Sequence, residues 1–497
     1  MRNEKKFYVG GGIAKNAFLY ALPIVLEYCK IKRINTIILA DHLLDITKEK
    51  TFKEKIGSII FLSEKDILPF YYKSNFLIFL IFFFKSISLF FKINKKNLLD
   101  KKKDFTETQI YHAVWDIAQR DAKDGIFSFK NENLSYNKWD IFKSCFKVCL
   151  NIKIGKILFQ QNVKSALIAH NVYQHKSLCA ILRKKDIDIL HINSFVIYRQ
   201  KKSKDTCFTL IDKNLMKLIM KKIKKKEIIR YFNEKISGKS KYDDSNFSFK
   251  KTQNIKKIKN VIFLQIFRDS SFKWIDRDRI FVDQLDWFIQ TLKILSKVDE
   301  KWHIKIHPSS LRWGENQNIW IESVMRKLFG KNLPKNIILE TNSINNNDLL
   351  KSVDKIVSYH GSIINDAIAF GVKPISVNEN TATYYDNKLA FKPKNLNEYE
   401  KLLKNKNLKK FKVSKKQIFE AKKLIFIKEN LFEIRSSINA KKIFANDDGK
   451  YIQNDYTNIR KKIKYNLYYF HQIAQLLNHF NFSINKKYIR KFLKGVN

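Results

Sequence analysis

Short apolar runs alternate with amphipathic segments along the second half of the chain. Runs of strand length occupy 261–266, 302–306, 336–339, 355–358 and 373–377. Polar or small residues follow each run, and the segment after the first of them carries Phe281 and Leu285 at helical spacing. Gly371 ends the amphipathic segment at 363–370, as expected at a helix C-terminus. This alternation predicts an α/β domain over 260–412, with parallel strands joined by crossover helices.

The first half carries a looser version of the same pattern. An apolar run at 7–9 precedes Gly10-Gly11-Gly12, and further runs lie at 36–40, 163–169 and 188–192. The order of strand, glycine turn, helix and strand predicts a Rossmann-like domain over 1–236. The three glycines lack the full dinucleotide-binding spacing, so they indicate only a turn that lets a ligand approach the backbone.

Two further segments complete the expected organisation. The stretch 237–259 is polar with little periodicity, which is typical of a linker between domains. Beyond this second domain the chain is very basic, and we expect C-terminal helices over 413–497. The predicted fold class is therefore α/β, with two Rossmann-like domains followed by helices.

The most hydrophobic stretch of the chain is 76–91, with the sequence FLIFLIFFFKSISLFF. A helix that spans a bilayer needs about 20 apolar residues, and this stretch is shorter and is interrupted by Lys85. Two interpretations remain open with equal weight. The stretch forms either an interfacial helix on an anionic membrane or a helix buried in the core.

Charge and cysteine content restrict the setting of the protein. The 497 residues carry a formal charge of +49, which favours an anionic partner, although a general bias towards Lys, Ile, Asn and Phe explains much of the excess. The five cysteines are irregularly spaced, as in a reducing compartment. Glycines interrupt the apolar run that follows the charged N-terminus, so we expect no signal peptide and a cytoplasmic protein.

Polar residues follow the predicted strands of the second domain at the point where each strand ends. They are Asp269, His307, Thr341, His360-Gly361-Ser362 and Glu379. In a parallel sheet these ends lie along one edge, where α/β proteins bind their ligands. Each residue alone has a structural explanation, such as a helix cap or a surface loop. One shared site explains the whole set better.

The chemistry of these residues suits a nucleotide with a phosphate as leaving group. His307 can donate a hydrogen bond or a positive charge to a phosphate oxygen. We expect Ser362 to cap the following helix, whose free N–H groups and dipole also favour a phosphate. Asp366, on the first turns of that helix, can accept hydrogen bonds from ribose hydroxyls. Together these groups would stabilise negative charge on a departing nucleotide.

A general base has to come from the facing domain, because the acceptor enters from that side. His170 is our candidate, since it follows the predicted strand 163–169 directly. Asp116, on a helix predicted at 106–120, is expected behind it. The alternative for His170 is a purely structural histidine.

Four stretches of the chain together resemble the surface-polysaccharide (capsule and related glycan) glycosyltransferases of the GT-B architecture. They are FLQIFRDSSF, IKIHPSS, the segment LLKSVDKIVSYHGSIINDAIAFGVKPI, and 384–399 with its terminal Glu-Tyr pair. IYHAVWDIAQR and ALIAHNVYQHKSLCAILRKKDIDIL in the first half are similar more loosely. The third stretch resembles the segment of the family that holds the donor nucleotide, with Asp366 in place of the usual Glu.

The resemblance implies two Rossmann-like domains that face each other across a cleft, with 1–236 on the acceptor side and the sugar-nucleotide on 260–412. It implies no metal and no cofactor, and a CMP-activated sugar as a reasonable donor. The nucleotide is expected at Asp269, His307, Pro308, Ser309, His360, Gly361, Ser362 and Asp366. We therefore expect a metal-independent glycosyltransferase that extends a growing or lipid-linked polysaccharide at the inner face of the membrane.

Three other classes of protein share some of these features. A CDP-polyol phosphotransferase that builds teichoic-acid-like polymers shares the architecture and the phosphate-binding histidines. A metal-dependent transferase is indicated only by Asp276-Arg277-Asp278, a pattern that arises easily by chance. A basic nucleic-acid-binding protein would explain the charge, but no helix-turn-helix, zinc-finger or RNP pattern appears, so we expect no nucleic-acid partner.

Overall fold

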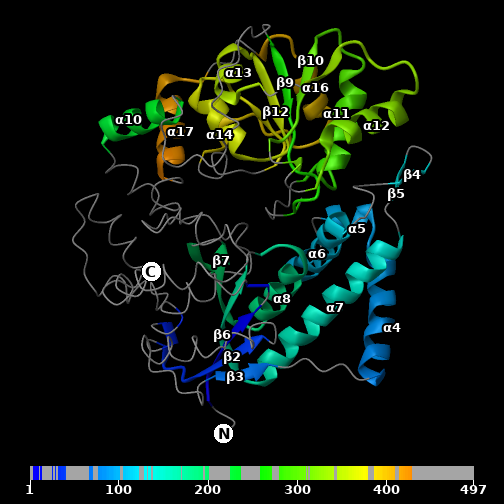
Figure 1. Cartoon of the computed structure of the whole chain (residues 1–497), viewed down its shortest axis with the longest axis vertical. Helices are drawn as coiled ribbons and strands as arrows, with labels where there is room; N and C mark the ends of the chain where they lie inside the picture. The colour runs from blue at the N-terminus through cyan, green and yellow to red at the C-terminus, as the bar shows by residue number, and fades with distance from the viewer. Residues whose placement is uncertain are drawn as a thin grey trace.

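The computed structural model of the protein has two α/β domains, one above the other in Figure 1. The structure describes residues 4–10, 12–13, 25, 28–29, 32–40, 67–70, 76–100, 104–121, 128–130, 133–135, 138–169, 171–193, 196–200, 224–236, 258–270, 272, 279–308, 310–311, 314–340, 344–378, 386–408 and 413–427. The predictions for His170, Ser309, Thr341, Glu379, residues 276–278, most of the linker at 237–259 and all of 428–497 lie outside these residues.

The N-terminal domain is built on a six-stranded sheet in the order β3-β2-β1-β6-β7-β8. Its strands are β1 (Lys6–Gly10), β2 (Thr36–Ala40), β3 (Ile67–Phe70), β6 (Val163–Ala169), β7 (Asp188–Asn193) and β8 (Val196–Gln200). The pairs are parallel except for β7 with β8, which is antiparallel. The strand order reverses between β1 and β6, as in Rossmann folds.

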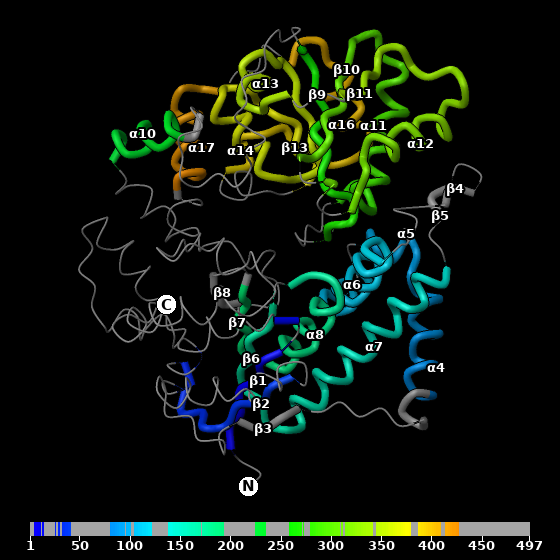
Figure 2. Tube along the Cα trace, in the orientation of Figure 1, coloured from blue at the N-terminus to red at the C-terminus, as the bar shows by residue number. Residues whose placement is uncertain are grey.

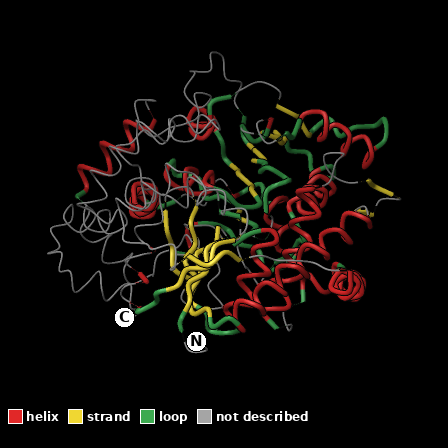
Figure 3. Tube along the Cα trace, turned by 60° about the horizontal axis from the view of Figure 1, so that its bottom comes forward, coloured by secondary structure: helices red, strands yellow, loops and turns green. Residues whose placement is uncertain are grey.

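The helices of this domain gather beside the sheet, and Figure 3 shows them in red next to the yellow strands. They are α4 (Phe76–Lys92), α5 (Lys95–Leu99), α6 (Phe105–Asp121), α7 (Lys138–Gln160) and α8 (Tyr173–Lys184). A two-stranded hairpin of β4 (Ser128–Lys130) and β5 (Asn133–Ser135) lies between α6 and α7 in sequence. Leu178 and Leu182 of α8 pack with Ala166 and Ile168 of β6 in one buried cluster.

The C-terminal domain has a five-stranded, fully parallel sheet in the order β11-β10-β9-β12-β13. Its strands are β9 (Asn260–Phe263), β10 (Trp302–Lys305), β11 (Ile337–Glu340), β12 (Lys355–Ser358) and β13 (Ile375–Ser376). Its helices are α10 (Lys225–Ile236), α11 (Gln284–Leu295), α12 (Gln317–Phe329), α13 (Asn346–Ser352), α14 (Ser362–Ala369), η4 (Asn387–Leu389), α16 (Leu396–Lys404) and α17 (Lys415–Ile427). Here the order reverses between β9 and β12.

This sheet is covered on both faces, which explains why its strands read as continuous apolar runs. Along β9, Val261 and Phe263 belong to one buried cluster, whereas Ile262 and the following Leu264 belong to another. The alternation follows from the two-residue period of a strand. The first cluster includes α13 and α14, and the second includes α11, α12 and α16. The prediction of an α/β fold with two Rossmann-like domains is confirmed.

One boundary differs from the sequence-based prediction. We expected α10 in the N-terminal domain, but Ile228, Tyr231 and Phe232 are buried in the core of the C-terminal domain. The Tyr231 ring lies edge-on to Phe426 of α17, with 5.5 Å between the two ring centroids. In Figure 2 the green α10 accordingly lies beside the orange α17. The C-terminal domain therefore includes α10, which lies before residue 237, as well as α17.

The hydrophobic helix α4 is partly buried and partly exposed. Phe82 and Ser86 are buried against the rest of the helical layer, and Phe82 lies edge-on to Phe146 of α7. Phe84 and Phe91 are 65% and 76% exposed. No helix in the described part of the chain is long and apolar enough to cross a membrane.

Candidate functional site

The carboxyl edges of the two sheets face each other, and a hydrogen bond joins them. Tyr173, the first residue of α8 after β6, donates its hydroxyl to Asp269 Oδ1 after β9 at 3.1 Å. Arg268, beside Asp269, donates from Nη2 to the backbone carbonyl of Arg120 at 2.6 Å. The Arg120 guanidinium in turn lies 4.5 Å from the centroid of the Tyr173 ring. The loops after β6 and after β9 are therefore in contact with each other.

Asp269 and His307 come together as the sequence predicts. They follow β9 and β10, which are neighbouring parallel strands. Burial lowers the pKa of His307 below its ordinary value, and the nearby carboxylate of Asp269 opposes this shift by raising it. At neutral pH the imidazole is therefore uncharged, so His307 offers a phosphate an N–H donor and not a positive charge. Pro308 follows it and is exposed.

Two residues that we did not single out hold these loops in place. The buried carboxylate of Glu315 accepts the backbone N–H groups of Phe267 and Arg268, each at 3.0 Å. Gln317, also buried, accepts the backbone N–H of His307 at 2.8 Å and donates to the Gln265 carbonyl at 2.7 Å. Glu315 and Gln317 thus connect the loop after β9 to the loop after β10.

The third element of the site is the turn between β12 and α14. Gly361 is the N-cap of α14 and has a φ of 133°, a conformation that L-residues rarely adopt. A Cβ atom on Gly361 would lie 2.4 Å from Nε2 of Gln265, so the end of the Gln265 side chain would have to move to make room for it. Gln265 itself donates to the hydroxyl of Ser358 at 3.4 Å. The turn is therefore fixed against the loop after β9.

Ser362 does not cap α14, contrary to our expectation. It is the first residue of the helix, it is exposed, and the N-cap position makes no side-chain hydrogen bond. Gly361 occupies the N-cap position with a φ of 133°, which would be strained for a serine. His360 is buried next to Tyr359, and Asp366 lies half-buried one turn into the helix. The N–H groups of the first turn of α14 therefore remain at the carboxyl edge of the sheet.

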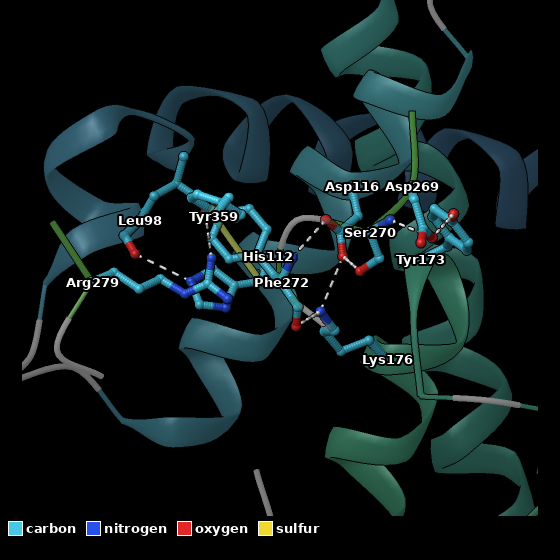
Figure 4. Close-up of polar contacts among 10 residues, drawn as sticks. All are labelled: Leu98, His112, Asp116, Tyr173, Lys176, Asp269, Ser270, Phe272, Arg279 and Tyr359. Carbon is cyan, nitrogen blue, oxygen red and sulfur yellow. Dashed lines mark hydrogen bonds and ion pairs between the residues drawn. The ribbon is translucent and has the colours of Figure 1, made fainter. Parts of the chain in front are cut away.

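The turn at Tyr359 is also tied to the joint between the domains, which Figure 4 shows in close-up. Arg279 donates from Nη1 to the Tyr359 hydroxyl at 3.1 Å, and its guanidinium lies 4.3 Å from the centroid of the Phe272 ring. Phe272 stacks on His112 of α6, with 3.9 Å between the ring centroids. Burial, followed by the charges of Arg279 and Lys176, holds the pKa of His112 well below its ordinary value.

Asp116 lies in this joint and not at an open surface. Its carboxylate pairs with Lys176 Nζ at 3.0 Å, accepts the backbone N–H of Phe272 at 3.3 Å, and accepts a short hydrogen bond from the Ser270 hydroxyl. Neither charged side chain is exposed. The structure therefore gives Asp116 contacts that join the domains, and its support of a base at His170 stays a prediction.

The N-terminal side of the region contains a histidine that sequence analysis missed. His175 lies on the first turn of α8, and a Cβ atom on Gly12 would lie 2.3 Å from its Nε2. Gly12 has a φ of 78°. The glycine turn after β1 thus approaches α8 closely, at the point where the strand order of this sheet reverses. The side chain of Asn171, buried before the helix, has no hydrogen-bond partner for Oδ1 among the described residues.

The side chains of the described residues bear on metal ligation. In the part of the chain that the structure describes, no group of three or more His, Cys, Asp and Glu side chains could hold a metal ion. The pair at 276 and 278 is not included in that part. Metal-independent transfer therefore stays a prediction.

Comparison with known proteins gives remote likenesses only. No family model and no curated protein matches the sequence. Among solved structures, UDP-GlcNAc 2-epimerase from Methanocaldococcus jannaschii is 13% identical, with 85% of this chain and 99% of that chain covered and a TM-score of 0.27. The KpsC beta Kdo 2,4 transferase of Thermosulfurimonas dismutans is 11% identical, with 52% and 79% covered and a TM-score of 0.31. The glycosyltransferase SnogD from Streptomyces nogalater is 8% identical, with 85% and 95% covered and a TM-score of 0.23. These TM-scores assign the chain to no family, and its fold is defined by its own two sheets.

Proposed function

We propose that the protein is a glycosyltransferase that uses a nucleotide-activated sugar. The observation that carries the proposal is the arrangement of side chains at the strand reversal between β9 and β12. There Asp269, His307 and the N-terminus of α14 lie along one carboxyl edge, and Tyr173 of the other domain faces them. Doubly wound sheets bind nucleotides at such reversals.

Each residue has a distinct role in this proposal. The donor phosphate lies at the first turn of α14, where N–H groups and the helix dipole favour negative charge. The neutral imidazole of His307 donates a hydrogen bond to the same phosphate, and Asp366 accepts from the ribose. In the transfer, the bond between the anomeric carbon and the phosphate oxygen breaks. A bond to an acceptor hydroxyl forms, and its proton passes to a base.

The acceptor side is the N-terminal domain. His170 remains our candidate for the base, and the facing edge also carries His175 and Tyr173. The acceptor we propose is a growing or lipid-linked surface polysaccharide, with a CMP-activated sugar as donor and no metal. The exposed aromatic residues of α4 support work at the inner face of an anionic membrane.

Nucleotide binding is the first test. Thermal unfolding is measured with CMP, CDP, UDP and GDP. A nucleotide at roughly 100 times its dissociation constant should stabilise the protein by about 2.7 kcal/mol. His307→Ala should abolish the shift and the transfer while leaving the protein folded. His303→Ala is the matched control, because His303 lies within β10, before the loop that carries His307, and its ring pairs with Glu340 at 2.5 Å.

The same assay separates the related chemistry. Release of CMP from a CMP-sugar, together with attachment of the sugar to a polysaccharide primer, supports glycosyl transfer. Incorporation of glycerol phosphate from CDP-glycerol would point to a polyol phosphotransferase instead. Full activity in the His307→Ala variant, or no thermal shift with any of the nucleotides, would overturn the proposed donor site.

A further inference from the structure

A pocket lies in the N-terminal domain, apart from the residues of the proposed donor site. This pocket of about 270 Å³ opens where α4, α6 and α7 meet. Phe82 and Leu89 of α4 and Ile110 of α6 contribute apolar side chains to its lining. In Figure 1, α4 is the outermost helix of this layer, and α7 lies between α4 and α8. No residue of the proposed donor site lines this pocket.

The charged groups of the pocket are mostly cationic. Lys85 and Lys92 come from α4, and Lys153 and Lys156 come from α7. Among the described residues, none of these four ammonium groups forms a salt bridge. The one acidic side chain of the lining is Glu107, which accepts a short hydrogen bond from Tyr111. Four ammonium groups around one cavity favour an anion, and a phosphate is the anion that lysine commonly binds.

An exposed apolar stripe runs along α4 beside these lysines. Ile81, Phe84 and Phe91 are 45%, 65% and 76% exposed. Their spacing puts them on one face of the helix, and Lys85 and Lys92 each follow a phenylalanine of the stripe by one position. Trp139, at the start of α7, is 61% exposed and stacks on Phe142, whose ring also lies edge-on to Phe83.

A surface that combines exposed apolar side chains with several lysines suits an anionic amphiphile as its partner. A water-soluble phosphate would use the lysines but would leave the phenylalanines in water, where a contiguous apolar patch is unfavourable. A lipid bilayer satisfies both, because its headgroup phosphates attract lysine and its acyl boundary takes up aromatic side chains.

We propose that this face of the N-terminal domain docks on an anionic lipid bilayer. The pocket between α4, α6 and α7 takes the phosphate of one lipid headgroup, and Ile81, Phe84 and Phe91 insert at the acyl boundary. This docking site deepens the membrane attachment proposed above and rests on it, but it does not rest on the nucleotide site.

Vesicle co-sedimentation at physiological salt tests the cationic part. Vesicles of phosphatidylcholine are compared with vesicles that also contain phosphatidylglycerol. Lys85→Glu combined with Lys156→Glu reverses one exposed charge on each helix and should weaken binding to the anionic vesicles at least about tenfold. The control combines Lys331→Glu with Lys335→Glu, two exposed lysines of the C-terminal domain, and should bind within about twofold of wild type.

The apolar part needs its own variant. Phe84→Ser with Phe91→Ser should weaken vesicle binding about tenfold or more, because the bilayer would no longer bury these two aromatic side chains at its acyl boundary. Leu311→Ser with Ile319→Ser is the control, since these C-terminal residues are 70% and 67% exposed. All four variants are also checked for wild-type thermal unfolding and for an unchanged thermal shift with nucleotide.

The outcomes separate the possibilities. Loss of vesicle binding in the pocket and stripe variants only, with the nucleotide shift intact, supports the docking site. Equal weakening in the Lys331 and Lys335 control would mean that the overall charge attracts lipid, and the pocket assignment fails. The variant with Phe84→Ser and Phe91→Ser could also bind vesicles as tightly as wild type, and inorganic phosphate could compete with that binding. This result would identify a free anion as the ligand. Either of these last results overturns the proposal, whereas a failed nucleotide shift alone leaves it standing.

Discussion

Lys176 Nζ lies 3.0 Å from a carboxylate oxygen of Asp116, and neither side chain is exposed to solvent. Both residues belong to the N-terminal domain, on α8 and α6, but their remaining hydrogen bonds go to the other domain. Lys176 donates to the Phe272 carbonyl at 2.7 Å, and Asp116 accepts from Ser270 and from the Phe272 backbone. The buried ion pair of the N-terminal domain therefore binds the loop that follows β9 in the C-terminal domain.

Breaking this pair should destabilise the protein strongly. Asp116→Asn leaves the Lys176 ammonium buried without a counter-charge, and we expect a loss of about 3–5 kcal/mol in the free energy of unfolding. Urea unfolding followed by tryptophan fluorescence measures it. The double variant with Lys176→Met should lose less than the sum of the single losses, because no isolated charge is left.

An exposed ion pair provides the comparison for that experiment. Lys351 pairs with Asp348 at 3.2 Å, and its side chain is 57% exposed. Lys351→Ala should change the free energy of unfolding by no more than about 1 kcal/mol. A similarly small change for Asp116→Asn would show that the joint is not held by the buried charges.

Gly361→Ala should disrupt the turn before α14. The φ of 133° is unfavourable for alanine, and the new Cβ would lie 2.4 Å from Gln265 Nε2. We expect a loss of roughly 1–3 kcal/mol from the backbone alone, with a weaker thermal shift by nucleotide. Gly330→Ala is the control, since Gly330 also has a positive φ, of 64°, but has no atom within 4 Å of the added Cβ. Equal losses in both variants would contradict the close approach at Gln265.

The stability of the protein should depend on pH through His307. Burial lowers its pKa in the folded state, so above the unfolded value of about 6.5 the ring is neutral in both states. As the pH falls below about 6.5, the unfolded chain takes up a proton first, and the free energy of unfolding decreases by up to about 1.4 kcal/mol per pH unit. His307→Gln should therefore lose less stability than wild type between pH 7 and pH 5.

Urea unfolding at several pH values measures this difference. Asp269→Asn removes the carboxylate that raises the pKa of His307, so the pH dependence should extend to lower pH in that variant. If the His307→Gln curve runs parallel to the wild-type curve, His307 titrates at the same pH in both states and the burial assignment fails.

Glu315→Gln should separate the loops after β9 and β10. The new amide group replaces a carboxylate oxygen that accepts a backbone N–H, so one buried donor loses its partner. We expect a loss of about 1.5–3 kcal/mol, together with weaker nucleotide binding because His307 is positioned through Gln317. Thermal unfolding with and without nucleotide measures both effects. Glu322→Gln, on the exposed side of α12, should change neither.

Much of the architecture could be predicted from the sequence because buried parallel strands are continuous apolar runs. Strands β2, β6 and β12 lie at 36–40, 163–169 and 355–358 as predicted, and the other predicted strands differ by up to about three residues at their ends. Strands β3, β4, β5 and β8 were not predicted. His307 and Asp269 could be found because each directly follows such a run. The local sequence pattern was sufficient to place a residue when the residues that determine its position belong to the same strand or turn.

Long-range contacts could not be predicted in this way. Glu315 and Gln317 lie in a polar stretch that resembles a solvent-exposed loop, and their partners Phe267 and Gln265 are 48 and 52 residues away. The amphipathic pattern of α10 indicates an apolar face but not which sheet that face covers. Ser362 was expected as the N-cap from its residue type, whereas in the structure Gly361 occupies that position, with a positive φ that the sequence pattern does not reveal.

The docking of Phe272 between α6 and α8 also has a consequence for the order of folding. Lys176 precedes Phe272 by 96 residues along the chain. At a synthesis rate of about 5–20 residues per second, roughly 5–19 s pass between their appearance during translation. During that interval the ammonium group has Asp116 but not the backbone carbonyl that completes its environment. The N-terminal domain thus reaches its final form only after the first strand of its successor has left the ribosome.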